Sequence, residues 1–179
     1  MNQHLKNIIE ALLSVAKKPL SVQEIAFCFD DSEVIEMEAI ESALEELVFD
    51  YQYRAMELKE VKSGWRLQVK ADYALWVGRL WQEKPNRYSR AFMETLALIA
   101  YKQPITRGEI EEVRGVSVSS SIMKSILERE WIRVLGHKEV PGRPALYGTT
   151  RQFLDDFNMR NLDDLPSLLE LNSFAELEK

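Results

Sequence analysis

The chain carries nearly the same nine letters at two places, KKPLSVQEI at residues 17–25 and KQPITRGEI at residues 102–110. In both copies a proline, which cannot continue a preceding helix, is followed two residues later by a hydroxyl side chain. A glutamate follows three residues after the hydroxyl, which is the spacing of a helix capping box. The repeat therefore predicts, twice, that one helix ends, the chain turns and a second helix begins. The paired positions are Ser21 with Thr106 and Glu24 with Glu109.

Length and composition suit a cytoplasmic protein with one ordinary domain or two small ones. The chain has 179 residues, of which 46% are apolar, enough for real hydrophobic cores. No apolar run approaches the ~18 residues of a membrane-spanning helix, and the charged N-terminus is unlike a signal peptide. Cys28 is the single cysteine. It lies in the apolar run IAFCF, so we expect it to be buried.

Hydrophobic periodicity around the first copy of the repeat predicts three helices, a hairpin and a further helix. The hairpin comes from two alternating runs, MELKEVKS and GWRLQVK, that meet at Ser63-Gly64. The segment KPNRYS at residues 84–89 then interrupts the pattern. The expected helices are 3–17, 22–29, 35–51 and 71–81.

The second half repeats this order. Two strand-like runs, WIRVLGHKEV and ALYGTT, are joined by PGRP, in which Pro141-Gly142 suits the central positions of a type II turn. The expected helices are 92–101, 107–113, 118–130 and a closing helix that begins near Phe153.

Three helices followed by a β-hairpin form a winged helix. We therefore predict a mainly α fold with small β-hairpins (α+β), built as two tandem winged-helix domains. The expected boundaries are 1–84 for the first domain, 85–89 for a linker, 90–165 for the second domain and 166–179 for an acidic tail.

Charge tests whether these domains bind DNA, because phosphate contacts supply most of the affinity. Residues 1–86 hold ten Lys and Arg against fifteen Asp and Glu, a net charge of −5. Residues 87–152 hold eleven against seven, a net of +4. The third helix of the first domain, at 35–51, is strongly acidic, so we exclude DNA reading for that domain.

The second domain leaves weak, non-specific DNA contact open, and its mildly basic character admits an alternative function as a winged-helix transcription regulator. The side chains for such contact are Arg107, Lys124 and Lys138.

The sequence shows no arrangement typical of catalysis or cofactor binding. His4 and His137 have no partner at metal-ligand spacing, and no glycine-rich phosphate loop is present. We expect neither an enzyme, nor a metal site, nor a cofactor; an active site assembled from distant residues remains the third reading.

Two stretches, ETLALIAYKQPITRGEIEEVRGV at 94–116 and KEVPGRPALYGTT at 138–150, resemble the segregation and condensation protein B family. The sequence FLDDF…LDDLP at the end of the second predicted domain extends the resemblance to about residue 165. The family is the bacterial accessory subunit of the SMC–kleisin complex. The resemblance implies tandem winged helices, a homodimer formed through the N-terminal domain, and binding to a central segment of the kleisin ScpA. It further implies contact with the SMC ATPase through the kleisin, and a role at the nucleoid in chromosome condensation and segregation during cell division.

The resemblance also directs attention to particular residues. Arg143 in the PGRP turn is hard to explain structurally, so we expect it to face a partner, with structural surface as the other reading. The remaining candidates for kleisin contact are Glu111, Arg114 and Tyr147. The candidates for a dimer contact are four apolar residues of the first helix, some of which must also belong to the core: Leu5, Ile8, Ile9 and Leu12.

Overall fold

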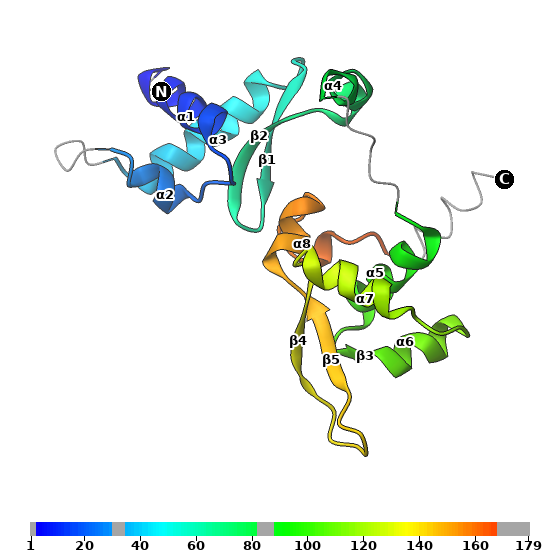
Figure 1. Cartoon of the computed structure of the whole chain (residues 1–179). Helices are drawn as coiled ribbons and strands as arrows, with labels where there is room; N and C mark the ends of the chain where they lie inside the picture. Colours follow the sequence, from blue (N-terminus) through cyan, green and yellow to red (C-terminus); the bar gives the residue numbers. More distant parts are fainter. Residues whose placement is uncertain (1–2, 30–34, 82–87, 168–179) are drawn as a thin grey trace. The chain divides into compact units, whose positions relative to one another are not determined.

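The computed structural model describes residues 3–29, 35–81 and 88–167. The chain divides into two compact units, Met1–Pro85 and Asn86–Lys179. In each unit three helices precede an antiparallel hairpin, as Figure 1 shows. The prediction of two winged-helix units, mainly α with small β-sheets, is confirmed.

The first unit begins with a helix that brings Leu5, Ile9 and Leu13 to its buried side. These side chains meet Ile25 and Ile40 of the next two helices, all of them shielded from solvent. The elements in chain order are α1 (Gln3–Val15), α2 (Val22–Ala26), α3 (Met37–Asp50), β1 (Met56–Val61), β2 (Gly64–Val69), the 3-10 turn η1 (Ala71–Tyr73) and α4 (Ala74–Trp81).

The second unit repeats this plan with a larger aromatic core. Trp131 lies just before the β4–β5 hairpin, which is the wing of this unit, as the β1–β2 hairpin is the wing of the first. It packs edge-on against Phe92 and Phe157, with ring centroids 6.1 and 5.0 Å away. Its elements are α5 (Arg90–Lys102), β3 (Ile105–Thr106), α6 (Arg107–Arg114), α7 (Ser120–Glu128), β4 (Ile132–His137), β5 (Ala145–Thr149), α8 (Arg151–Asp156) and the 3-10 turn η2 (Leu162–Asp164).

The residue that precedes each capping hydroxyl joins the turn to the wing. In the first unit Leu20 exchanges two backbone hydrogen bonds with Trp65 of β2, with N···O distances of 2.9 and 2.8 Å. In the second unit Ile105 of β3 pairs with Tyr147 of β5, so the sheet order is β3-β5-β4. The two copies of the repeated segment, residues 17–25 and 102–110, therefore occupy equivalent places in the two units.

Glycine is required where the wing approaches this turn in the first unit. Gly64 has φ +136°, and a Cβ placed there would lie 2.3 Å from the carbonyl oxygen of Leu20. In the second wing, the turn of Val140, Pro141, Gly142 and Arg143 closes with a 2.9 Å hydrogen bond from Arg143 N–H to Val140 O, and Gly142 has φ +85°. This geometry is that of the predicted type II turn.

Several helix ends differ from the prediction because side-chain caps decide them. The helix predicted at 118–130 begins at Ser120, since Ser119 accepts a hydrogen bond from Ser121 N–H at the N-cap, which leaves Val118 buried in the preceding loop. It ends at Glu128 because Glu130 adopts a left-handed conformation with φ 58°. The helix predicted at 22–29 ends at Ala26.

Part of the expected linker packs with the second unit. Within residues 85–89, positions 85–87 lie outside the described residues, but Ser89 caps α5 and Tyr88 stacks on Phe92 with ring centroids 4.8 Å apart. Of the expected tail, residues 168–179 lie outside the described residues, while Tyr101 donates a 2.5 Å hydrogen bond to the carbonyl of Pro166.

The expectation that Cys28 is buried is wrong. Its side chain is exposed, and Sγ lies 3.3 Å from the carbonyl oxygen of Glu24. The apolar run IAFCF is split by the end of α2, so Ile25 points into the core while Phe27 and Cys28 point outward.

Replacement of Gly64 by Ala is expected to destabilise the protein by about 2–3 kcal/mol, because alanine is strained at this φ and its Cβ meets backbone atoms. Gly78, where an added Cβ meets nothing within 4 Å, is the control. Gly78→Ala is expected to stabilise by about 0.5–1 kcal/mol. Urea unfolding measures both, and exchange of the Leu20 and Trp65 amide protons would locate the loss. Equal stability for the two variants would contradict the role of Gly64.

Candidate functional site

Both predicted capping boxes are present. In the first unit the Glu24 carboxylate accepts from Ser21 N–H at 2.9 Å, while Ser21 Oγ accepts from Glu24 N–H at 3.2 Å. The backbone hydrogen bond from Ser21, followed by the hydrogen bond from Lys18, lowers the pKa of Glu24 to about 2.

The second box has an additional partner from the wing. Glu109 accepts from Thr106 N–H at 2.8 Å, and its other carboxylate oxygen lies 2.6 Å from Nζ of Lys138, just beyond β4. The hydrogen bond from Lys138, followed by that from Thr106 N–H, lowers the pKa of Glu109 to about 2. Lys138, predicted as a weak DNA contact, therefore ties the wing to the start of α6.

The predicted partner residues of α6 form internal contacts. Arg114 has only 9% of its side chain exposed, and its guanidinium lies 3.1 Å from the Glu94 carboxylate of α5. Glu111 accepts from Val118 N–H at 2.9 Å and from Arg107 Nε at 3.0 Å. These hydrogen bonds, the one from Val118 first, lower the pKa of Glu111. Arg114 thus pairs, largely buried, with a partly exposed glutamate of α5, and Glu111 holds the loop between α6 and α7.

Arg107, predicted as a DNA contact, belongs to the same loop network. Besides Glu111 it donates to Ser120 Oγ at 3.1 Å and to the carbonyl of Val118. Lys124 of α7 is exposed and lies 3.6 Å from Glu128, one turn further along the helix.

The wing supplies the most accessible of the predicted partner residues. Arg143 is 71% exposed and lies 3.1 Å from the Glu139 carboxylate across the turn. Tyr147, in the middle of β5, is half-buried against the core of the unit. Figure 1 shows the tip of this wing projecting beyond α6. The contact of Arg143 lies within the wing turn, whereas Glu111 and Arg114 contact Val118 and Glu94.

The dimer residues predicted in α1 are largely occupied by the core. Leu5 and Ile9 are 5% and 0% exposed, so a partner cannot reach them without opening the unit. Leu12 is half-buried against the same core, and Ile8 is half-buried. Leu5 and Ile9 are therefore the members of this set that belong to the core, and a dimer contact through Ile8 and Leu12 stays a prediction.

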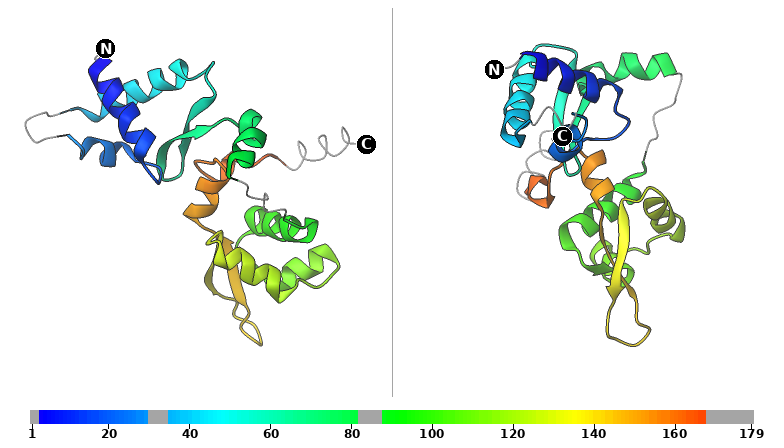
Figure 2. Two further views of the ribbon diagram at one scale, coloured as in Figure 1. Left: turned by 45° about the horizontal axis from the view of Figure 1, so that its top comes forward. Right: turned by 90° about the vertical axis from the view of Figure 1, so that its left-hand side faces the viewer.

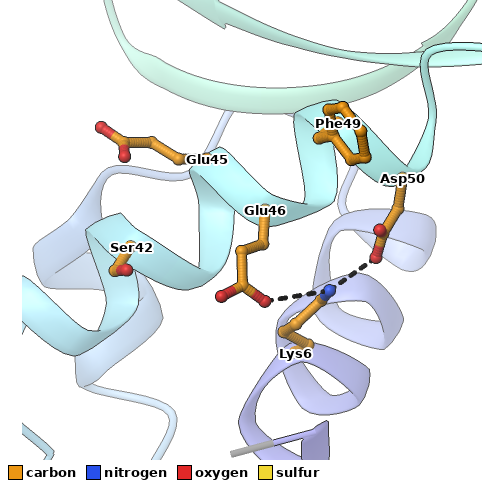
Figure 3. A pocket seen from close by; sticks show the side chains of 6 residues that line it. All are labelled: Lys6, Ser42, Glu45, Glu46, Phe49 and Asp50. Atoms are coloured by element: carbon orange, nitrogen blue, oxygen red, sulfur yellow. Dashed lines mark hydrogen bonds and ion pairs between the residues drawn. The ribbon is translucent and has the colours of Figure 1, made fainter. Parts of the chain in front are cut away.

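A pocket of about 400 Å³ lies between α1 and α3, lined by Lys6, Ser42, Glu45, Glu46, Phe49 and Asp50 (Figure 3). The nearly buried ammonium of Lys6 lies 2.6 Å from the Asp50 carboxylate and 3.1 Å from that of Glu46. The hydrogen bond to Asp50, partly opposed by desolvation, raises the pKa of Lys6. The lysine therefore stays protonated, which suits an ion pair that joins two helices and does not suit a nucleophile or base.

The last helix of the first unit is exposed on nearly all sides. Trp76 is 62% and Leu80 76% exposed, and none of residues 74–80 belongs to the buried cluster of the unit. Both views of Figure 2 show α4 leaving the end of β2 and projecting from α1–α3. The other large apolar residues exposed on η1 and α4 are Tyr73, Leu75 and Val77.

The described ranges, 3–29, 35–81 and 88–167, contain neither a metal-binding cluster nor a membrane-spanning helix. There, no three His, Cys, Asp or Glu side chains are grouped so that they could hold a metal ion. No helix in that part of the chain is both long and apolar enough to cross a membrane.

Comparison with known families gives one match along most of the chain. The family described as segregation and condensation complex subunit ScpB matches residues 7–168, which include both winged-helix units. The chain belongs to the ScpB family. A segregation and condensation protein B homolog of Coxiella burnetii is 50% identical over 173 residues, covering 97% of this chain and 83% of the relative. Segregation and condensation protein B of Syntrophotalea carbinolica is 43% identical over 177 residues, covering 98% and 86%.

Solved structures of the ScpB family also match. ScpB from Mycobacterium tuberculosis is 29% identical, with a TM-score of 0.39, over 87% of this chain and 95% of that one. A dimer of an ScpB N-terminal domain complexed with ScpA peptide is 25% identical, with a TM-score of 0.39, over 44% of this chain and 95% of that one. At these TM-scores neither structure bears on the placement of the elements described above.

Sequence reasoning missed two features of this ScpB family member. Gln103 joins α5 to β5, since its Oε1 accepts from Thr149 N–H at 2.7 Å and its Nε2 donates to Thr149 Oγ1 at 3.0 Å. Its place within the second copy of the repeat, KQPITRGEI, gave no hint of a long-range contact. The exposure of α4 was missed as well, although its almost uninterrupted apolar sequence, ALWVGRLW, was a usable signal.

The lowered pKa values of Glu24 and Glu109 predict stability that is lost in acid. Each carboxyl has a pKa of about 2 when folded against an ordinary value of 4.5, so its contribution is complete above pH 4.5 and disappears as the pH falls towards 2. Glu109→Gln keeps an acceptor but cannot titrate. The urea midpoint of this variant is expected below that of the parent at pH 7 and to approach it near pH 2. A pH-independent difference would contradict this assignment.

Proposed function

We propose that this protein is a non-enzymatic subunit of the SMC–kleisin complex. In this proposal it binds the central segment of the kleisin ScpA as a homodimer and acts at the nucleoid, in the cytoplasm, in chromosome condensation and segregation. The observation that carries the proposal is a match to the ScpB family across both winged-helix units, the first of which has an acidic third helix. The family is described as a complex subunit and is not an enzyme family.

The third helix of the first unit argues for a protein partner. Helix α3 exposes the acids Glu38, Glu41 and Glu45, and it contains no Lys or Arg that could balance their charge. A helix of this charge would be repelled by phosphates at the edges of a DNA groove.

The second unit has more positive charge, but much of it is already paired. Arg107 is bound to Glu111 and Lys138 to Glu109, so these side chains would have to break existing contacts to reach a phosphate. Lys124 is paired only weakly, at 3.6 Å, and one lysine does not read a base sequence. These contacts favour a protein-binding role over the alternative of a transcription regulator.

Light scattering on a sizing column tests the proposal, with the protein alone and with the kleisin from the same genome. We expect the mass of a dimer alone and a stable, heavier complex with the kleisin. If the protein does not bind the kleisin, the proposed function is overturned. A nanomolar and strongly salt-dependent affinity for one DNA duplex sequence would instead support a transcription regulator.

Arg143→Glu tests the wing as a kleisin contact. Its guanidinium is exposed and pairs with Glu139 in the same turn, so its replacement is expected to preserve the fold and to weaken kleisin binding about tenfold or more. Lys124→Glu is the matched control, since it reverses a charge that is 77% exposed and also paired with a glutamate four residues away. Titration by calorimetry measures both. If the two variants bind the kleisin with equal affinity and have unchanged circular dichroism, Arg143 is a surface residue without a role in kleisin binding.

A further inference from the structure

The exposed helix α4 carries a continuous apolar stripe. With 100° between successive helical residues, Tyr73, Trp76, Val77 and Leu80 fall on one side, at the i, i+3, i+4 and i+7 positions of a packing face. All four are exposed. Val69, at the end of β2 and two residues before η1, is exposed too. Contiguous apolar surface of this kind marks a binding site.

The charges beside the stripe indicate what kind of partner fits it. Asp72 and Arg79 are seven residues apart and therefore lie along the same flank of the stripe, one at each end. When two identical helices pack antiparallel about a two-fold axis, the same flanks meet with their ends exchanged. Asp72 of one copy then faces Arg79 of the other, and the pair occurs twice.

Like charge disfavours most other faces for self-association. Residues 1–86 carry a net charge of −5, and the exposed side of α3 is acidic, so two copies that met there would repel. Between Ala74 and Trp81 the single charged residue is Arg79, so α4 brings no such repulsion.

We propose that α4 packs antiparallel against α4 of a second copy of this chain, with the stripe buried and two Asp72–Arg79 pairs at its ends. The proposal rests on the proposed homodimer and specifies its surface. An isologous contact of this kind counts every favourable interaction twice. The two short helices alone cover less than the roughly 1,200 Å² of a stable interface, so the half-exposed face of β2 beside Val69 belongs to the same contact.

Leu80→Glu tests the stripe in the full-length protein. It would bury two carboxylates in an apolar contact, and we expect the dimer dissociation constant to rise about 100-fold or more. Val15→Glu is the control, because Val15 is equally exposed, at 78% against 76%, and also lies near the end of a helix of the first unit. Its dissociation constant is expected to stay within about twofold of the parent. Sedimentation equilibrium measures each value, and circular dichroism checks folding.

A charge exchange tests the antiparallel pairing. Asp72→Arg and Arg79→Asp each place like charges opposite one another at both ends, so each is expected to weaken the dimer about threefold to tenfold at low salt. The double variant restores opposite charges and is expected to recover the parental constant. Additive weakening in the double variant would overturn the antiparallel arrangement.

The outcomes separate this inference from the proposed function. A dimeric parent whose Leu80→Glu variant is still a dimer would overturn the α4 surface and leave the homodimer standing. A variant that stays dimeric but loses the kleisin would assign α4 to the kleisin instead. A monomeric parent would overturn both.

Discussion

Backbone pairing between a turn and a wing is the constraint on which the arrangement of each unit depends. The residue before the capping hydroxyl, Leu20 or Ile105, pairs with the second strand of the hairpin at Trp65 or Tyr147. This pairing brings the start of the second helix against the wing, and the helix then buries Ile25 or Ile110 in the core. Proline, cap and isoleucine recur in the sequence because this one junction requires all three in a fixed order.

The fold could be predicted almost completely because its signals are local. Capping boxes, alternating strands and the Pro141-Gly142 turn depend on neighbours a few residues away, and each is present. Environments that depend on contacts over long sequence distances were harder to predict. Arg114 was a candidate for contact with the kleisin, and its guanidinium lies largely buried against Glu94 of α5 instead of on an open surface. No local pattern distinguishes these two arginine environments.

The candidate site was predicted less well, for a related reason. Leu5, Ile8, Ile9 and Leu12 satisfy the core periodicity of α1, and the same apolar pattern serves a core or an interface equally well. Only the packing decides, and it places Leu5 and Ile9 inside while α4 is left outside. The charge pattern of the predicted third helix was more informative, because charged side chains are excluded from a core and stay on the surface. Glu38, Glu41 and Glu45 are exposed on α3.

The carboxylate of Glu109 serves two neighbours at once, the first turn of α6 and Lys138 of the wing. Since the one carboxylate stabilises both the cap of α6 and the position of Lys138, a change at either contact alters the other. A protein that binds the wing and draws the Lys138 ammonium towards itself would leave the cap weaker and Glu109 easier to protonate. By reciprocity, protonation of Glu109 would free the lysine for that protein. Binding at the wing and the capping of α6 are thereby linked through the protonation of Glu109.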